Sequence, residues 1–483
     1  MLPVPDPARP TQVPLAVDLD GTLIKTDLLW ESLAALLRRN PFALLQVPFW
    51  WARGRAHLKQ QLAARVQLDT AALPYHEEFL AWLKAQKATG RKLILATASD
   101  LEMAKPVAQH LGLFDEVMAS DGITNLRADA KLAALTKKFG ARGFDYAGNS
   151  TVDLAVWQGT REAIVVNAGA RLAAQAAART KVGRTFLSPA SRLNAFWHCL
   201  RPHQWIKNLI IFVPVLTAHQ LGDRAVLTAA ALAFVAFCLC ASSVYTLNDL
   251  VDLDADRHHA TKRQRPFAAG ELPLSVGFIA VPLLLAASLG LALSLSAAFA
   301  AVLAGYFFAA LGYSLRLKQV AILDVFVLAG LYTLRLVAGH VATGIAWSAW
   351  LLMFSMFIFL SLALMKRFQE LHSLRQQNQH AAKGRGYTAQ DLELVTTLGL
   401  VSGFLAVLVL ALYVNSEQVI KLYAHPTRLL LVCPLMLYWV SRVWFLAHRG
   451  QMHDDPTAFA FKDGVSYLIA ALTLTAMWLA TGI

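Results

Sequence analysis

Four carboxylates and four cations lie between two apolar runs in the stretch from Asn248 to Gly270. If this stretch is helical, at about 100° per residue, most of its polar side chains share roughly one third of the circumference, and Asp254 points away. Like charges this close repel unless a cation lies between them, and Mg²⁺ held by carboxylates and phosphate oxygens meets that need. The spacing therefore predicts a Mg²⁺ and diphosphate site. The shared face holds Asn248, Asp249, Asp252, Asp256 and His259.

The cations follow at once, as Arg257, Lys262, Arg263 and Arg265. They are charge-assisted donors of the kind that phosphate oxygens accept. A basic loop beside a membrane explains such cations equally well, but it does not explain carboxylates at helical spacing next to an apolar span. The expected roles are metal binding for Asp249, Asp252 and Asp256, orientation for Asn248 and His259, and phosphate contact for Arg265.

This stretch resembles the first aspartate-rich motif of the UbiA superfamily of membrane prenyltransferases. The similarity is closest to the branch that makes decaprenylphosphoryl phosphoribose, because Arg201-Pro-His-Gln-Trp-Ile-Lys-Asn208 and Lys366-Arg367-Phe-Gln-Glu370 also look like motifs of that branch. The resemblance covers roughly residues 195 to 483. It implies that substrates bind to Lys207, Asn208, Tyr313, Lys318, Asp324, Lys366 and Arg367.

Superfamily members with aromatic acceptors usually carry a second aspartate-rich motif in the equivalent of the stretch after Tyr313. Here that stretch keeps one carboxylate, Asp324, and contains the cations Arg316 and Lys318. Cations near the site suit a donor or acceptor with additional phosphates. Anchoring at the membrane interface explains them equally well.

A second set of motifs lies near the N-terminus. Val13 to Val17 is typical of a short buried parallel strand, and Asp18-Leu-Asp-Gly-Thr22 follows at its carboxyl end, where open α/β sheets bind ligands. The pattern resembles the first motif of haloacid dehalogenase-like phosphatases. This resemblance implies that Asp18 is the nucleophile that forms an aspartyl-phosphate. It also implies that Asp20 protonates the leaving alcohol and later activates water.

The other motifs of that family occur in order. Lys92 to Ala96 predicts a second buried strand, and the hydroxyl of Thr97 after it matches the phosphate-binding position. Lys131, at the start of a helical pattern, matches the lysine that offsets phosphate charge. Phe144 to Asp153 matches the metal-binding motif, except that Asn149 stands where the family usually has an acid, which leaves open an active, a weakened or an inactive phosphatase. The implied Mg²⁺ residues are Asp18, Asp20, Asn149 and Asp153, together with a backbone carbonyl.

Between Leu23 and Gly90 the apolar residues recur at helical spacing, which predicts a helical cap over the site. Within it, Pro41 to Trp51 is too short to span a bilayer but is rich in residues that favour a membrane interface. Arginines flank this segment on both sides. Two interpretations stay open: the cap touches the membrane, or these aromatic residues pack the core of the cap.

Composition sets the class of protein. A chain of 483 residues with 57% hydrophobic and 16% charged residues indicates a membrane protein of two or more units. The net charge of +13 suits anionic lipids or phosphate substrates. The sequence has no basic segment interleaved with aromatic residues, so nothing in it favours binding of nucleic acid. The four cysteines lack a metal-ligand pattern and are expected to pack in the core. The start, Met1 to Pro10, has no apolar run of signal-peptide length.

Hydropathy predicts about nine membrane spans, and loops rich in Lys and Arg are expected on the cytoplasmic side together with the phosphatase. Nine spans would put the two termini on opposite sides of a bacterial inner membrane. The predicted spans lie near residues 206–221, 225–246, 273–294, 297–316, 320–341, 345–365, 391–413, 428–447 and 465–482.

These features predict a Rossmann-like α/β domain over residues 1–185, with its cap at about 24–90, and then an all-α polytopic bundle over 195–483. The linker between them passes through Ser188-Pro189. The implied partners are a lipid bilayer, a diphosphate-containing donor and a polyprenyl phosphate or other isoprenoid lipid, with Mg²⁺ as cofactor. A homo-oligomer is compatible with the sequence.

Three functions remain open. The first is transfer of a 5-phosphoribosyl group from phosphoribosyl diphosphate to polyprenyl phosphate, followed by removal of the 5-phosphate. The second is transfer of a prenyl group from its diphosphate to an aromatic acceptor such as 4-hydroxybenzoate. The third is a transporter or scaffold with a degenerate phosphatase.

Overall fold

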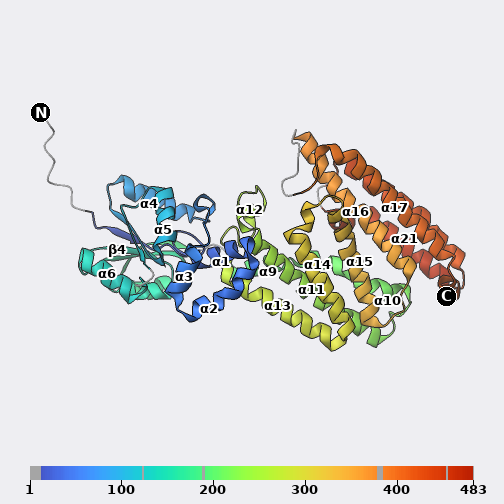
Figure 1. Ribbon diagram of the computed structural model, residues 1–483, viewed down its shortest axis with the longest axis horizontal. Helices are drawn as coiled ribbons and strands as arrows, with labels where there is room; N and C mark the ends of the chain where they lie inside the picture. The colour runs from blue at the N-terminus through green and yellow to red at the C-terminus, as the bar shows by residue number, and fades with distance from the viewer. Residues whose placement is uncertain (1–11, 122–124, 188–190, 378–384, 453–454, 482–483) are drawn as a thin grey trace. The chain divides into compact units, whose positions relative to one another are not determined.

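The computed structural model describes residues 12–121, 125–187, 191–377, 385–452 and 455–481. The linker position at 188–189 and the start of the chain lie outside these residues. The chain forms two compact units (Figure 1). The first comprises Met1–Leu200 and Tyr245–Val281, and the second comprises Arg201–Val244 and Pro282–Ile483.

A parallel six-stranded sheet forms the centre of the first unit, in the order β3-β2-β1-β4-β5-β6. This is the doubly wound order, which confirms the predicted α/β class. Val17 of β1 pairs with Leu95 of β2 on one side and with Ala147 of β4 on the other. The strands are β1 (Leu15–Val17), β2 (Leu93–Asp100), β3 (Glu116–Ser120), β4 (Asp145–Gly148), β5 (Glu162–Ala168) and β6 (Lys181–Leu187).

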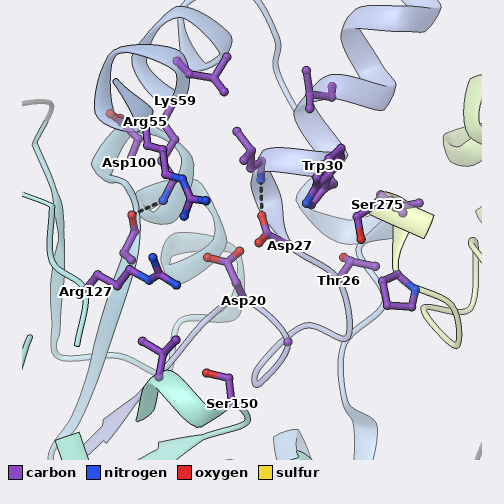
Figure 2. A pocket seen from close by; sticks show the side chains of 18 of the residues that line it. Asp20, Thr26, Asp27, Trp30, Arg55, Lys59, Asp100, Arg127, Ser150 and Ser275 are labelled. Atoms are coloured by element: carbon purple, nitrogen blue, oxygen red, sulfur yellow. Dashed lines mark hydrogen bonds between the residues drawn. The ribbon is translucent and has the colours of Figure 1, made fainter. Parts of the chain in front are cut away.

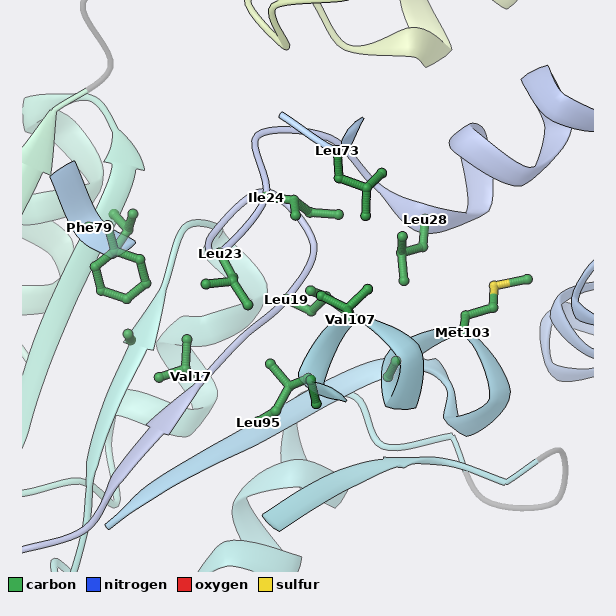
Figure 3. Close-up of a cluster of buried hydrophobic side chains, with 14 of the residues drawn as sticks. Val17, Leu19, Leu23, Ile24, Leu28, Leu73, Phe79, Leu95, Met103 and Val107 are labelled. Carbon is green, nitrogen blue, oxygen red and sulfur yellow. The ribbon is translucent and has the colours of Figure 1, made fainter. Parts of the chain in front are cut away.

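Successive side chains of a strand point to opposite faces of the sheet, so the apolar strands present apolar side chains on both faces. Helices cover each face. Leu15 and Val17 join the cluster shown in part in Figure 3 with α4 (Glu77–Ala88) and α5 (Leu101–Leu111). Ala16 joins a separate cluster on the other face. The helices on that face are α6 (Asp129–Phe139), α7 (Leu154–Trp157) and α8 (Ala170–Ala177).

The segment between β1 and β2 holds the predicted cap helices. Asp27 begins the first of them, since its side chain accepts a hydrogen bond from the Leu29 backbone N–H, as an N-cap does. The fourth helix, α4, packs with the sheet through Phe79 and Leu83. The remaining elements of the segment are α1 (Leu28–Arg39), η1 (Pro41–Gln46), α2 (Val47–Ala52), α3 (Arg55–Ala63) and η2 (Thr70–Ala72).

The aspartate-rich stretch packs within the first unit, against α1. Ala34 of α1 shares an apolar cluster with Leu253 and Phe267. Gly270 closes the stretch at φ +70°, and a Cβ there would lie 2.7 Å from the Cβ of Lys25. Only glycine suits this position. The elements here are α9 (Arg192–Leu200), the end of α11 (Arg224–Val251), α12 (Leu253–Arg257), η5 (Lys262–Gln264) and the start of α13 (Leu274–Leu295).

The second unit is helical, as predicted. Its further elements are η4 (Pro202–Phe212), α10 (Val213–Thr217), α14 (Ala297–Leu315), η6 (Leu317–Gln319), α15 (Leu323–Thr343), α16 (Ala349–Gln376), η7 (Ala389–Asp391), α17 (Leu392–Val414), α18 (Glu417–Leu422), η8 (Pro426–Leu431), α19 (Val432–His448), α20 (Pro456–Ala460) and α21 (Gly464–Thr481).

Eight helices among the described residues are long and apolar enough to cross a membrane, one fewer than hydropathy predicts. The missing span is residues 206–221, which the structure forms as η4 and the short helix α10. Pro202 and Pro214 lie at the starts of these two elements, where the N–H that proline lacks would have no helical partner. A proline also interrupts a helix that would otherwise run through its position. An even number of crossings would place both ends of the spanning region on one side of the membrane.

Gly399 allows α17 to approach α19 closely, because a Cβ on it would lie 2.1 Å from Trp444. We predict that Gly399→Ala lowers the thermal unfolding midpoint in detergent. Gly330→Ala is the matched control, since Gly330 lies in α15 with no atom within 4 Å of an added Cβ. Both substitutions raise helix propensity equally. Equal midpoints for the two variants would contradict close packing at Gly399.

Candidate functional sites

The carboxyl ends of β1 and β4 form the first candidate site. Asp18 follows β1 and accepts a hydrogen bond from Lys131 Nζ at 2.7 Å. The same ammonium group donates to the Tyr146 hydroxyl at 2.8 Å, and that hydroxyl donates to Asp153 Oδ1 at 2.9 Å. The expected nucleophile, its cation and one expected metal residue are therefore joined in one buried network. Tyr146, which links them, lies inside the Phe144 to Asp153 stretch, but the sequence analysis gave it no role.

Asp20 is held from two sides. The Leu28 backbone N–H donates to Oδ1 at 2.8 Å, and Ser99 Oγ donates to Oδ2 at 2.7 Å. Thr97 is more distant from Asp20, at 3.4 Å. Strand β2 continues to Asp100 rather than ending before Thr97 as predicted, and this longer strand brings Ser99 to the site. Sequence reasoning missed Ser99.

The loop after β4 is closed by Asp153, whose Oδ2 accepts hydrogen bonds from both N–H groups of Asn149 and Ser150 and from the Ser150 hydroxyl. Asn149 Oδ1 accepts a hydrogen bond from Thr22 Oγ1 at 3.3 Å. Its amide also lies against Gly21, where an added Cβ would be 2.1 Å from Asn149 Nδ2. Asn149 is therefore packed against the Asp18 to Thr22 loop, and Asp153 fixes the backbone beneath it.

The carboxylates of this site repel one another. Burial raises the pKa of Asp18 to about 7; Lys131 opposes this rise, and Asp153 and Asp20 add to it. Burial also raises the pKa of Asp27 to about 7, with Asp20 contributing. A bound cation would relieve this repulsion. Within the described ranges no group of three or more His, Cys, Asp or Glu side chains is already arranged to hold a metal ion.

A cavity of about 730 Å³ opens above Asp18 and Asp20. Figure 2 shows Arg55, Lys59 and Arg127 on one side of Asp20 and Trp30 and Ser275 on the other. The cavity thus combines a carboxylate floor, a cationic side and a partly apolar side.

The aspartate-rich stretch forms the second candidate site. It is nearly continuous helix, because Asp252 N–H donates to the Asn248 carbonyl and Asp256 N–H to the Asp252 carbonyl, both at 2.8 Å. Asp249 and Asp256 are buried and both accept hydrogen bonds from Arg265 Nη1, at 3.1 and 2.6 Å. Two members of the predicted face, Asp249 and Asp256, therefore converge on one guanidinium group.

His259 makes local contacts with the residues that follow it. It is exposed, and its Nδ1 is 3.3 Å from the Thr261 backbone N–H, as in a local turn. For Asp256, burial raises the pKa and Arg265 opposes the rise. Asp256 thus lies in surroundings that favour an added cation.

Arg257 was expected to bind phosphate, and the structure places it elsewhere. Its guanidinium donates to both carboxylate oxygens of Glu31, at 3.0 and 2.6 Å, and both side chains are about 95% buried or more. Arg38 donates to Asp254 at 3.0 Å beside this pair. Arg257 therefore attaches the aspartate-rich stretch to cap helix α1 and is not available as a phosphate ligand in this arrangement.

The second unit holds a further cluster, which sequence reasoning missed in part. Lys366 Nζ lies 3.0 Å and Lys207 Nζ 3.6 Å from the same oxygen of Asp455. Burial alone would raise the pKa of Asp455, but the two lysines outweigh burial and hold the pKa below its usual value. Two expected substrate lysines thus meet at a carboxylate that belongs to none of the motifs.

The other expected substrate residues of this unit form separate contacts. Asn208 accepts a hydrogen bond from Arg335 Nε at 2.7 Å, and Arg335 also donates to Tyr306 at 2.9 Å. Asp324 accepts from Tyr387 at 2.5 Å and lies 3.4 Å from Arg367 Nε, with both Asp324 and Arg367 buried. Tyr313 accepts from Arg385 at 2.9 Å. Lys318 lies in η6.

Two families match this chain. Residues 209–469 match the UbiA prenyltransferase family, and residues 15–158 match the haloacid dehalogenase-like hydrolases. The chain belongs to the UbiA prenyltransferase family. Its N-terminal part is a haloacid dehalogenase-like domain, and the eight apolar helices make it an integral membrane protein.

Some relatives of this UbiA protein match nearly all of the chain, and others match about half of it. An uncharacterized protein, y4nM, of Sinorhizobium fredii is 39% identical over 97% of this chain and 91% of its own length. A decaprenyl-phosphate phosphoribosyltransferase of Mycolicibacterium smegmatis is 38% identical over 44% of this chain and 68% of its own. A UbiA homologue of Archaeoglobus fulgidus, solved with DMAPP and Mg²⁺, is 17% identical, with a TM-score of 0.46 over 60% of this chain and 99% of that one.

We predict that Asp455→Asn lowers the thermal unfolding midpoint, because it leaves two lysines without their shared carboxylate. The loss should be the same from pH 5 to pH 8. A depressed carboxyl pKa keeps Asp455 ionised throughout this range, and its contribution is lost only as pH falls through the folded-state pKa.

Glu417→Gln is the control, since Glu417 is exposed and lies 4.0 Å from Lys421. A loss for Asp455→Asn that matches this control, or that appears only above pH 6, would contradict the assignment.

Proposed function

We propose that the membrane unit transfers a 5-phosphoribosyl group from phosphoribosyl diphosphate to a polyprenyl phosphate, and that the haloacid dehalogenase-like domain then removes the 5-phosphate. One observation carries this proposal. The aspartate-rich stretch and the phosphatase-like site belong to one compact unit, attached through the buried pair of Arg257 and Glu31. Phosphoribosyl transfer leaves a phosphomonoester on a lipid, and prenyl transfer to an aromatic ring leaves none.

The transfer step needs few groups from the protein. The acceptor phosphate is already an anionic nucleophile, so the chain must position the reactants and stabilise the departing diphosphate. The carboxylates fit a divalent cation, because Asp249 and Asp256 already converge on a cationic group, Arg265. Mg²⁺ held by Asp249, Asp252 and Asp256 would neutralise the leaving diphosphate. Arg265 then donates hydrogen bonds to the phosphate oxygens of the diphosphate.

We propose that Lys207 and Lys366 also contact substrate phosphate. Lys207 and Lys366 carry two positive charges against the single negative charge of Asp455. This surplus suits a substrate with several phosphates. The relative that is named decaprenyl-phosphate phosphoribosyltransferase supports this choice of donor and acceptor.

The phosphatase step follows from the geometry at Asp18. Its carboxylate attacks phosphorus while Lys131 offsets charge on the phosphoryl oxygens. Asp20, oriented by Ser99 and the Leu28 N–H, donates a proton to the leaving alcohol. Asp20 then accepts a proton from the water that attacks the aspartyl-phosphate, which releases phosphate and restores the Asp18 carboxylate. Asp18, Asp20 and the Asn149 amide oxygen fit Mg²⁺ as oxygen donors, with Asp153 fixing the loop that carries Asn149.

We place both sites on the cytoplasmic side of a bacterial inner membrane. The support is the number of cations in the aspartate-rich stretch, which the positive-inside rule assigns to that side. The UbiA family also includes prenyl transfer, so transfer of a prenyl group to an aromatic acceptor is the second candidate. Membership of a transferase family leaves the transporter interpretation without support.

We predict that Asp256→Asn reduces transfer by at least about a hundredfold at limiting Mg²⁺ while the protein still inserts in the membrane, because an amide cannot balance the charge of Mg²⁺. Asp254→Asn is the matched control, since Asp254 points to Arg38. Formation of the lipid product from labelled phosphoribosyl diphosphate measures both. Equal activity in the two variants would remove Asp256 from the site.

We predict that Asp18→Asn leaves transfer intact and makes the lipid-linked 5-phosphoribose accumulate, because an uncharged amide is a poor nucleophile. Mass spectrometry of the lipid products should show the dephosphorylated ribose lipid for the wild type. Identical products from both proteins would refute the coupled reaction. A product from a prenyl diphosphate and 4-hydroxybenzoate instead would favour the second candidate.

A further inference from the structure

The cap segment Pro41–Ala52 has two faces of different character. Ala43 and Trp50 are buried in the apolar cluster of the cap. Phe42, Leu45 and Phe49 are 79%, 71% and 72% exposed. One face therefore packs the cap, as the second interpretation predicts, and the other face presents large apolar side chains outward. A face of this kind needs a partner.

Charge indicates which partner fits. Between Ser32 and Leu68 the chain has six cations and no acid. Four of the cations flank the segment and are exposed, namely Arg38, Arg39, Arg53 and Arg55. Aromatic and aliphatic side chains beside arginines are the pattern of an element that lies in the headgroup region of an anionic bilayer.

Position indicates the same partner. The cavity above Asp18 is lined by Leu44, Val47 and Trp51 of this segment, and also by Leu274 and Phe278 of α13. Helix α13 is one of the candidate membrane spans, so its first turns lie at a bilayer interface. Trp30 of α1 contacts Phe278, with ring centroids 5.4 Å apart. The cavity is therefore lined both by the segment that carries the exposed apolar face and by the start of a candidate membrane span.

We propose that Pro41–Ala52 docks in the interface of an anionic lipid bilayer and forms the lipid-side wall of the phosphatase cavity. The cavity then receives a phosphomonoester whose remainder stays in the membrane. The phosphate would reach the cationic side with Arg55 and Arg127, and the lipid chain would leave along the apolar side (Figure 2). Docking itself does not depend on the proposed function, whereas the lipid specificity rests on it.

Docking is tested with the full-length chain in nanodiscs. A fluorescent probe is attached at Leu45→Cys in a background with Cys433→Ser, and the matched control is the same probe at Lys137→Cys, which is exposed in α6. Lipids with a nitroxide headgroup should quench the probe at position 45 several-fold more than the control, and more strongly with phosphatidylglycerol present. Equal quenching at both positions overturns docking. Crosslinking between copies at position 45, without lipid quenching, overturns it in favour of a second copy of this chain.

Lipid specificity is tested with Phe42→Ser/Leu45→Ser/Phe49→Ser, which removes only exposed side chains. Two substrates are compared, polyprenyl-phosphoryl 5-phosphoribose in nanodiscs and soluble ribose 5-phosphate. We expect the rate on the lipid substrate to fall about tenfold or more while the rate on the soluble substrate is unchanged. An equal effect on both substrates overturns the specificity. If the wild type hydrolyses neither substrate, the proposed phosphatase fails, and probe quenching still decides docking.

Discussion

Buried carboxylates that lie close to one another need cations, and this constraint shapes each candidate site. Lys131 forms an ion pair with Asp18, and Arg265 forms ion pairs with both Asp249 and Asp256. Two lysines form ion pairs with Asp455. Each carboxylate therefore has a cationic group within hydrogen-bond reach before any substrate arrives. A carboxylate attracts a metal ion and its neighbour attracts a phosphate oxygen. The pairing of carboxylates with cationic groups lowers the cost of burying these charges, and it also places groups that can bind a metal ion and phosphate oxygens.

The sheet places the first of these sites. Strands β1 and β4 are neighbours in space but are separated in sequence by β2 and β3, and a crevice forms where the order of the strands changes direction. Asp18 and Asn149 meet there. Because the cap is inserted directly after β1, its helices cover that crevice, and α1 also provides Glu31 to hold the aspartate-rich stretch.

Local motifs carried much of the information about both sites. The roles of Asp18 and Lys131 were predicted from their resemblance to the motifs of a known family. The spacing of the carboxylates was predicted from helical periodicity alone. Ser99 and Asp455 were not predicted, because one depends on how far a strand continues and the other on packing between distant helices. Hydropathy overcounted the spans for a related reason: it averages over Pro214, which lies inside the first apolar run at the start of the short helix α10.

The pair of Arg257 and Glu31 also determines how this protein can be divided. The two residues are 226 positions apart, and each would be a buried, uncompensated charge without the other. The haloacid dehalogenase-like and UbiA parts each correspond to a known family, but in this chain a buried ion pair makes each part depend on the other. A truncated version that starts after the linker would lose Glu31 and would expose the apolar residues Leu253 and Phe267, which share a cluster with Ala34 of α1.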